Sequence, residues 1–209
     1  MWTPWEGPGL EHLHLTQGSD GIVADGLIIG LRDGRPFRVR YTITCDERWR
    51  MRGADLLSLR ADRREVRLRT DGSGRWTTAH GEALPDLAGC MEVDISATPF
   101  TNTLPIRRLA LPSGAAADVP AAYIDVADFT VTPVPQRYTR LQTRADETRY
   151  LYQGLRWNFR ADVLVDDDGL VTEYPGLFRR VWAGSSYDHL LPGPSSGAGC
   201  CRAPWPAKA

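Results

Sequence analysis

The length, composition and charge of the chain exclude several classes of protein before any motif is considered. With 209 residues, of which 42% are hydrophobic and 24% charged, the chain has enough apolar side chains for one sizeable core and is not disordered along its length. Its 25 basic and 26 acidic residues leave a net charge of −1, so no overall positive field draws it to nucleic acid or to an anionic membrane.

The N-terminal stretch bears on where the protein resides. Residues 1–15 lack the basic start and apolar run of a cleaved secretory signal. No stretch approaches the roughly 20 apolar residues that a membrane-spanning helix needs. We therefore expect a cytoplasmic protein that does not span a membrane.

Four segments show the alternation of apolar and polar residues that is typical of a half-buried strand. They are residues 37–45, 66–69, 91–96 and 157–165. In the clearest of them, arginines and threonines alternate with Phe37, Val39, Tyr41, Ile43 and Cys45. Because the four segments are spread along the chain, we expect them to join one extensive sheet.

The connections favour antiparallel pairing. Glycine supplies positive φ in short β turns at little cost, and five pairs of this kind occur: Asp33-Gly34, Asp71-Gly72, Ser73-Gly74, His80-Gly81 and Asp168-Gly169. No segment has the apolar repeat of a crossover helix over three turns. One short helix is expected to begin at Thr98-Pro99, since Thr caps helices and Pro is favoured at their first position.

A sheet with one apolar face has to cover that face, and the chain offers no row of amphipathic helices for this purpose. The sheet must therefore curl or fold onto itself. A curled sheet leaves a concave apolar groove suited to an acyl chain. Alternatively, the same side chains pack against one another as a sandwich core. Periodicity leaves both arrangements open.

The C-terminal segment differs in composition from the rest of the chain. Residues 184–209 are rich in Pro, Gly and Ser, which is typical of a flexible segment that buries little. We therefore expect one domain over residues 1–183, followed by a flexible tail over residues 184–209.

The four cysteines do not have metal-ligand spacing. Cys45, Cys90, Cys200 and Cys201 form no C-x-x-C motif, and no histidine lies at zinc-finger distance from them. The sequence thus predicts neither a metal site nor a cofactor. Cys45 and Cys90 are expected to be reduced and buried, with a disulfide between them as the alternative.

One polar segment is a candidate for binding a headgroup. Arginine presents a planar fork of donors to carboxylate or phosphate, while Thr and Asn suit sugar hydroxyls. Residues 98–108 combine these types in Thr98, Thr101, Asn102, Thr103, Arg107 and Arg108. The structural alternative is that Thr and Asn satisfy backbone groups and that the arginines pair with Asp94 or Asp46.

A second cluster directly follows the most regular strand and contains Asp46, Trp49, Arg50 and Arg52. An aromatic ring beside arginine is suited to sugar stacking or to phosphate binding. The same pattern also arises where arginine stems cover a tryptophan at a strand edge, and we favour this structural interpretation.

No catalytic motif is present. The sequence contains no H-E-x-x-H pattern, no G-x-S-x-G elbow and no P-loop. An acid pair formed by Asp46 and Asp94, with Glu92 nearby, would be the basis of an enzyme acting on lipids or sugars, but that chemistry depends on a separation that the sequence does not define.

The run from Gly89 to Leu109, which contains Glu92, Asp94 and residues 98–108, resembles the signature of the bacterial putative glycolipid-binding family, formerly a domain of unknown function. Supporting matches extend the resemblance over about residues 5–182 and include Tyr41 to Asp46 with Trp49, Gly74 to Trp76, Gln136 with Tyr138, and Tyr174. The chain departs from the family pattern at Glu92, where Asp is usual.

The resemblance implies a single curved antiparallel sheet that forms an unclosed half-barrel, similar to lipoprotein-carrier half-barrels, with few short helices. It adds Gln136, Tyr138 and Tyr174 to the expected ligand-binding residues. The chain lacks the export signal of those carriers, which argues against envelope transport but not against lipid binding.

The sequence as a whole thus predicts a non-catalytic protein that binds a glycolipid or another amphiphilic lipid in an apolar groove, with no nucleic-acid partner. The alternatives are the enzyme with the Asp46 and Asp94 pair, and a partner-binding module that uses an open sheet edge.

Overall fold

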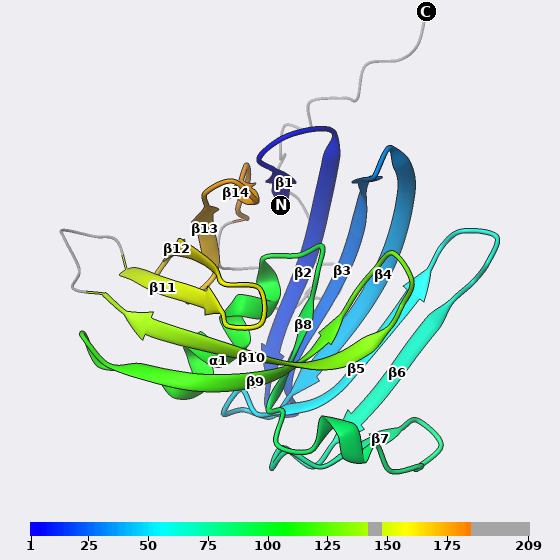
Figure 1. Cartoon of the computed structure of the whole chain (residues 1–209), viewed down its shortest axis with the longest axis horizontal. Coiled ribbons are helices and arrows are strands. Elements are labelled where there is room, and N and C mark those ends of the chain that lie inside the picture. The colour runs from blue at the N-terminus through cyan, green and yellow to red at the C-terminus, as the bar shows by residue number, and fades with distance from the viewer. Residues whose placement is uncertain (142–147, 185–209) are drawn as a thin grey trace, which may run out of the picture.

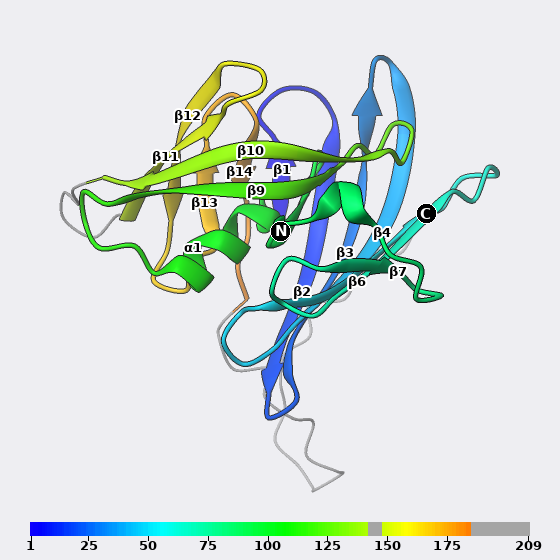
Figure 2. The ribbon, with the colours of Figure 1, turned by 60° about the horizontal axis from the view of Figure 1, so that its bottom comes forward.

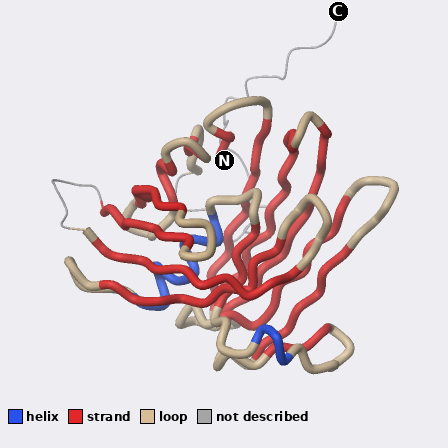
Figure 3. The backbone as a smooth tube through the Cα atoms, in the orientation of Figure 1, coloured by secondary structure: helices blue, strands red, loops and turns tan. Residues whose placement is uncertain are grey.

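The structure is a computed structural model that describes residues 1–141 and 148–184. Strands dominate it, and helical turns are few and short (Figures 1 and 3). The first seven strands are β1 (Trp2–Pro4), β2 (Gly9–Gly18), β3 (Gly21–Arg32), β4 (Arg35–Cys45), β5 (Met51–Ser58), β6 (Glu65–Thr70) and β7 (Trp76–Thr78).

The second half of the chain adds seven strands and the helical turns. Its strands are β8 (Glu92–Ile95), β9 (Ala116–Ile124), β10 (Val131–Arg140), β11 (Thr148–Gly154), β12 (Phe159–Val165), β13 (Val171–Tyr174) and β14 (Phe178–Arg180). The helical elements are the 3-10 turns η1 (Pro85–Leu87) and η2 (Phe100–Asn102) and the α-helix α1 (Thr103–Leu109).

All 14 strands belong to one sheet with the order β7-β6-β5-β4-β3-β2-β1-β14-β13-β12-β11-β10-β9-β8. Neighbouring strands are antiparallel throughout, with the exception of β8 and β9, which are parallel. The first and last strands meet in the middle, where β1 pairs with β14 along three residues and with β2 at one. The predicted antiparallel sheet is confirmed, and the parallel pair follows from the helical segment that links β8 to β9.

The sheet bends round on itself without closing. Figure 2 shows β9 and β10 running across the direction of β2, β3 and β4. The two edge strands do not pair with each other, but the connection between them is tied back to β7. Gly89 N donates to Gly74 O at 3.0 Å, and Trp76 Nε1 donates to Cys90 O at 2.8 Å. The expected half-barrel is thereby confirmed.

The protein's own residues occupy the concave side. One apolar cluster unites inward side chains of β3 to β7 with Phe100, Leu104 and residues of β8 and β9. A second cluster unites α1 with β9 to β13. Phe100 and Leu104 are both fully buried. Periodicity left open a curled sheet with a groove or a packed sandwich core. The structure combines a feature of each, because its single sheet is curved and its interior is packed.

The predicted strands lie where periodicity placed them, in β4, β6, β8 and β12. Met91 and Trp157 are exceptions, because Met91 lies just before β8 and Trp157 lies in the turn before β12, where it is 51% exposed. The short helix is also confirmed, with η2 directly after Pro99 and α1 continuing to Leu109. Cys45 and Cys90 are buried and free.

The predicted tail lies outside the described residues, apart from Gly184. Among the residues that the structure describes, no helix is long and apolar enough to cross a bilayer.

Candidate functional site

Two adjoining cavities lie beside the β3–β4 hairpin, at one end of the curved sheet. The first, here called the apolar cavity, has a volume of about 250 Å³. The second, the polar cavity, has a volume of about 400 Å³. Arg32, Phe37 and Val126 line both, so the two cavities share a wall.

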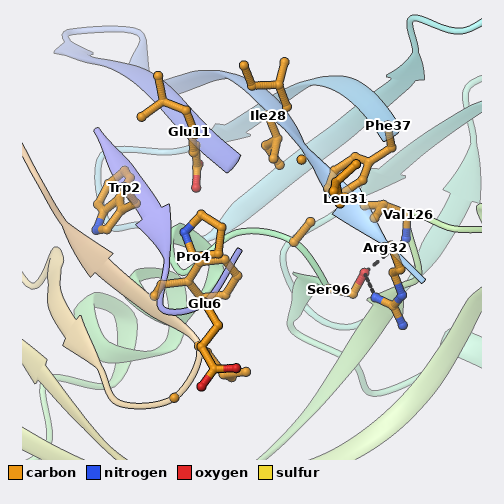
Figure 4. A pocket seen from close by; sticks show the side chains of 17 residues that line it. Trp2, Pro4, Glu6, Glu11, Ile28, Leu31, Arg32, Phe37, Ser96 and Val126 are labelled. Carbon is orange, nitrogen blue, oxygen red and sulfur yellow. Dashed lines mark hydrogen bonds between the residues drawn. The ribbon is translucent and has the colours of Figure 1, made fainter. Parts of the chain in front are cut away.

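The apolar cavity is built by the first four strands and β14, together with the connections β1–β2, β8–η2, β9–β10 and β13–β14 (Figure 4). Its wall contains Trp2, Pro4, Leu10, Ile28, Leu31, Phe37, Ala97, Val126, Leu177 and Phe178. Gly30 explains how Phe37 comes to lie there, because a Cβ at Gly30 would be 3.0 Å from the Phe37 ring. The glycine thus leaves room for the aromatic ring to cross β3 and form part of the wall.

Glu11 is the buried polar residue of the apolar cavity. Its side chain is only 3% exposed, although it lines the cavity. The Tyr41 hydroxyl donates to Glu11 Oε1 at 2.5 Å, and the Thr98 hydroxyl donates to the same oxygen at 2.7 Å. Oε2 is buried and has no partner among the described residues. Burial raises the pKa of Glu11 to about 7, even though both hydroxyls favour its charged form.

Sequence reasoning missed Glu11, but a signal was present. On β2, Glu11 shares a face with Leu13 and Leu15, which pack against the core. A carboxylate in phase with the apolar face of a strand is expected to be buried, and buried carboxylates are candidates for function.

The polar cavity lies where three connections meet. Its wall contains Arg32, Asp33 and Arg35 from the β3–β4 hairpin, Arg60 and Asp62 from the β5–β6 turn, and Ala127 and Phe129 from the β9–β10 loop. Arg32 Nη2 binds Asp125 Oδ2 at 3.2 Å, and Nη1 donates to Ser96 Oγ at 3.4 Å, the contact drawn in Figure 4. These contacts hold Arg32 at the boundary between the two cavities.

The structure places the predicted headgroup segment inside the fold. Thr98, Thr101, Asn102 and Thr103 are all buried. The Thr101 hydroxyl donates to Asp94 Oδ1 at 3.1 Å, and the Thr103 hydroxyl donates to Gly169 O at 2.9 Å. Asn102 accepts from the Tyr138 hydroxyl at 2.9 Å. The structure thus shows these side chains in internal hydrogen bonds.

The two arginines of this segment also contact the protein. Arg108 Nε donates to Glu92, whose side chain is 1% exposed. Burial raises the pKa of Glu92, and the Arg108 guanidinium opposes that shift. The Arg107 guanidinium lies 5.2 Å from the centroid of the Trp49 ring. Neither arginine pairs with Asp94 or Asp46, the partners that the structural alternative named.

Asp46 and its neighbours form a turn. Asp46 Oδ1 accepts from Arg48 N at 3.0 Å and from Arg50 N at 2.9 Å, and Oδ2 binds Arg52 Nη2 at 2.8 Å. Desolvation is the largest single effect and raises the pKa of Asp46, but the hydrogen bonds from the Arg50 and Arg48 backbone and the pairing with Arg52 together outweigh it and lower the pKa. The Trp49 ring is only 6% exposed, so its faces are covered by the protein.

The remaining candidates belong to the interior of the second cluster. Asp94 Oδ2 accepts from Gln136 Nε2 at 2.6 Å, and burial raises the pKa of Asp94. Tyr138 and Tyr174 are buried beside Tyr152, with ring centroids 5.3 Å and 6.1 Å from it. None of the predicted ligand-binding residues lines either of the two cavities.

Comparison with known proteins identifies the family to which the chain belongs. A family model described as Putative glycolipid-binding matches residues 1–180. The fold is similar to the crystal structure of a DUF1089 family protein from Pseudomonas aeruginosa, with a TM-score of 0.75 and 38% sequence identity over 85% of this chain and 95% of that one. No curated protein matches the sequence. With its family match over nearly the whole described chain, the protein belongs to the Putative glycolipid-binding family.

Proposed function

We propose that the protein binds an amphiphile of the glycolipid type without transforming it. Its apolar part enters the apolar cavity, and its polar headgroup occupies the polar cavity. The observation that carries the proposal is the shared wall, where Arg32, Phe37 and Val126 line both an apolar and a charged space. An amphiphile likewise has an apolar tail directly followed by a polar headgroup.

The sizes of the cavities limit the ligand. Sites for small ligands commonly measure roughly 300–1,000 Å³. The polar cavity, at about 400 Å³, falls within this range, whereas the apolar cavity, at about 250 Å³, falls just below it. The apolar cavity therefore suits a short chain or the end of a longer one. This site is smaller than a groove along the whole concave face of the sheet, because the segment from β8 to α1 packs against that face.

The contacts of the carboxylates support binding over catalysis. Asp46 is bound by the backbone of its own turn and by Arg52, and Asp94 is bound by Thr101 and Gln136. Neither carboxylate lines the two cavities. No observation therefore favours the enzyme that uses this pair.

The proposal is tested by titrating the protein with octyl β-D-glucoside below its micellar concentration and following tryptophan fluorescence and heat. Ala97 is half-buried in the wall of the apolar cavity, so Ala97→Phe places a ring inside it. We expect saturable binding by the native protein and a loss of at least tenfold in affinity for Ala97→Phe.

The matched control is Ala116→Phe, at an exposed position of β9 that lines neither cavity. Both variants should retain the circular dichroism of the native protein. Absence of saturable binding by the native protein, or an equal loss of affinity in both variants, would refute the proposed site.

A further inference from the structure

We infer that the headgroup carries an anionic group, of the phosphate or carboxylate class, which Arg35 and Arg60 bind in the polar cavity. This inference rests on the proposed function. It goes further because a sugar headgroup alone is neutral, whereas the charges that line this cavity are not balanced.

Two of the charged residues in the wall are already paired. Arg32 is bound by Asp125 at 3.2 Å. Asp62 is bound by Arg64 at 3.3 Å and accepts from the Ser58 hydroxyl at 3.0 Å. These two side chains therefore contribute little net charge to the cavity.

The other charged residues of the wall have no such partner. Among the described residues, no carboxylate lies within ion-pair distance of Arg35 or Arg60, and Asp33 forms no ion pair either. Two guanidinium groups thus face one carboxylate, and the excess is positive. A guanidinium offers several N–H donors in a plane, a geometry that matches carboxylate and phosphate oxygens.

Two strand arginines elsewhere on the sheet show what a matched acid looks like. Arg40 binds both oxygens of Asp25, at 3.1 Å and 2.8 Å, and Arg137 binds both oxygens of Asp118, at 2.6 Å and 2.9 Å. Arg35 and Arg60 have no such acid within ion-pair distance among the described residues, so their donors are available to a ligand.

The surroundings of the two arginines are partly apolar. Phe37, Val39, Val126 and Phe129 also line the polar cavity, so a headgroup bound by the exposed Arg35 and Arg60 would contact apolar side chains as well. The β9–β10 loop that carries Phe129 is tied across the cavity, since Arg64 Nη1 donates to Asp128 O at 3.2 Å and Asp125 binds Arg32. The cavity is thus held open by contacts that do not use Arg35 or Arg60.

The experiment compares three amphiphiles with the same tail: octyl phosphate, octyl β-D-glucoside and octyltrimethylammonium, titrated calorimetrically at low and at high salt. We expect octyl phosphate to bind roughly tenfold more tightly than octyl glucoside at low salt, with the cation weakest. The advantage of octyl phosphate should shrink at high salt.

The variants locate the effect. Arg35→Gln and Arg60→Gln should each weaken octyl phosphate severalfold and leave octyl glucoside within about twofold. The matched control is Arg160→Gln, because Arg160 is an exposed arginine of β12 that has no ion-pair partner among the described residues and lines neither cavity. It should leave all three affinities unchanged.

The outcomes separate the two proposals. If octyl glucoside binds at least as tightly as octyl phosphate, or if Arg160→Gln has the same effect as the cavity variants, the anionic headgroup is refuted and amphiphile binding stands. If none of the three amphiphiles binds, the proposed function fails. Inorganic phosphate that binds as tightly as octyl phosphate would show that the tail contributes nothing, and would overturn both.

Discussion

Glu11 illustrates how the environment of one residue controls stability. Its carboxyl group lies in the interior, accepts two hydroxyl hydrogen bonds on one oxygen and has no partner on the other. Burial raises its pKa from 4.5 to about 7. The folded protein therefore holds a proton that the unfolded chain has already lost between those two pH values.

The raised pKa of Glu11 makes the stability of the protein depend on pH. Because the folded pKa is the higher one, the stabilisation associated with the protonated group is complete below pH 4.5 and is lost as the pH rises through about 7. The loss amounts to about 3 kcal/mol by the relation between pKa and free energy. Glu11→Gln cannot ionise, so its stability relative to the native protein should rise between pH 4.5 and pH 7.5.

Urea denaturation of both proteins at several pH values measures this difference. A Tyr41→Phe variant should retain the pH-dependence, because desolvation and not the tyrosine hydroxyl causes the raised pKa. A free-energy difference between the native protein and Glu11→Gln that does not change with pH would contradict the assignment.

The ion pair of Glu92 and Arg108 gives a second prediction. Glu92 is 1% exposed, and Arg108 is its ion-pair partner. Removing one partner of a buried ion pair leaves an uncompensated charge. Arg108→Ala should therefore lower the free energy of unfolding by about 3 kcal/mol at pH 7.

The double variant Glu92→Leu with Arg108→Ala is the internal control, since it removes the buried charge as well. It should recover a large part of the loss in the same urea titration. Equal losses in the single and the double variant would show that packing of the arginine stem, and not the charge, dominates.

At the scale of one element, the β3–β4 hairpin requires glycine at two positions for different physical reasons. Gly26 lies opposite Tyr41 in the β3–β4 pairing, and a Cβ there would be 2.1 Å from the tyrosine ring. Gly34 lies in the turn with a φ of 72°, and a Cβ there would meet nothing within 4 Å. The first glycine is required for space and the second for backbone conformation.

Alanine substitutions separate these two reasons. Gly26→Ala should cost about 3 kcal/mol, because Tyr41 cannot yield without losing its bond to Glu11. Gly34→Ala should cost only about 1 kcal/mol, the penalty for a left-handed backbone. Thermal or urea unfolding measures both.

Gly18 serves as the control in the neighbouring strand, since a Cβ there meets nothing within 4 Å and its φ is not positive. Its substitution by alanine should be close to neutral. A larger loss for Gly34→Ala than for Gly26→Ala would contradict the steric explanation.

The segment from Thr98 to Leu109 shows that a helix can be predicted from sequence while its burial in the fold is not. Its proline and threonine residues predict a short helix, and the structure contains one. The same threonines look suited to a ligand, yet they satisfy buried acceptors such as Asp94 and the carbonyl of Gly169. Which of these two uses prevails depends on burial, which a local pattern does not reveal.

At the level of the complete fold, β1 joins the two halves of the sheet. It pairs with β2 on one side and β14 on the other. Trp2 anchors it, because the ring is 3% exposed and Nε1 donates to Val171 O at 2.7 Å. The contact links the second residue of the chain to a strand near the end of the described region.

Substitutions of Trp2 test this role. Trp2→Phe retains an apolar ring but leaves the Val171 carbonyl unpaired, at a cost of about 1–3 kcal/mol. Trp2→Ala also opens a cavity, and the cost should rise to about 3–5 kcal/mol. Trp182→Phe is the control, since Trp182 is 57% exposed and its substitution should change the free energy of unfolding by less than about 0.5 kcal/mol. Equal effects at the two positions would contradict the anchoring role.

Alternating side chains and turn glycines were enough to predict strands at four places and the antiparallel pairing, because these properties depend on neighbours within a few residues. The curved, unclosed sheet was implied only by the resemblance to the family, since alternation left a curled sheet and a sandwich both open. The resemblance to the family was likewise present in the residues themselves. The candidate cavities were not predictable in this way. Glu11 meets Thr98 across 87 positions, and Arg32 meets Asp125 across 93. Only the folded sheet brings such distant residues together, and only it decides which polar groups are consumed by internal bonds and which remain for a ligand.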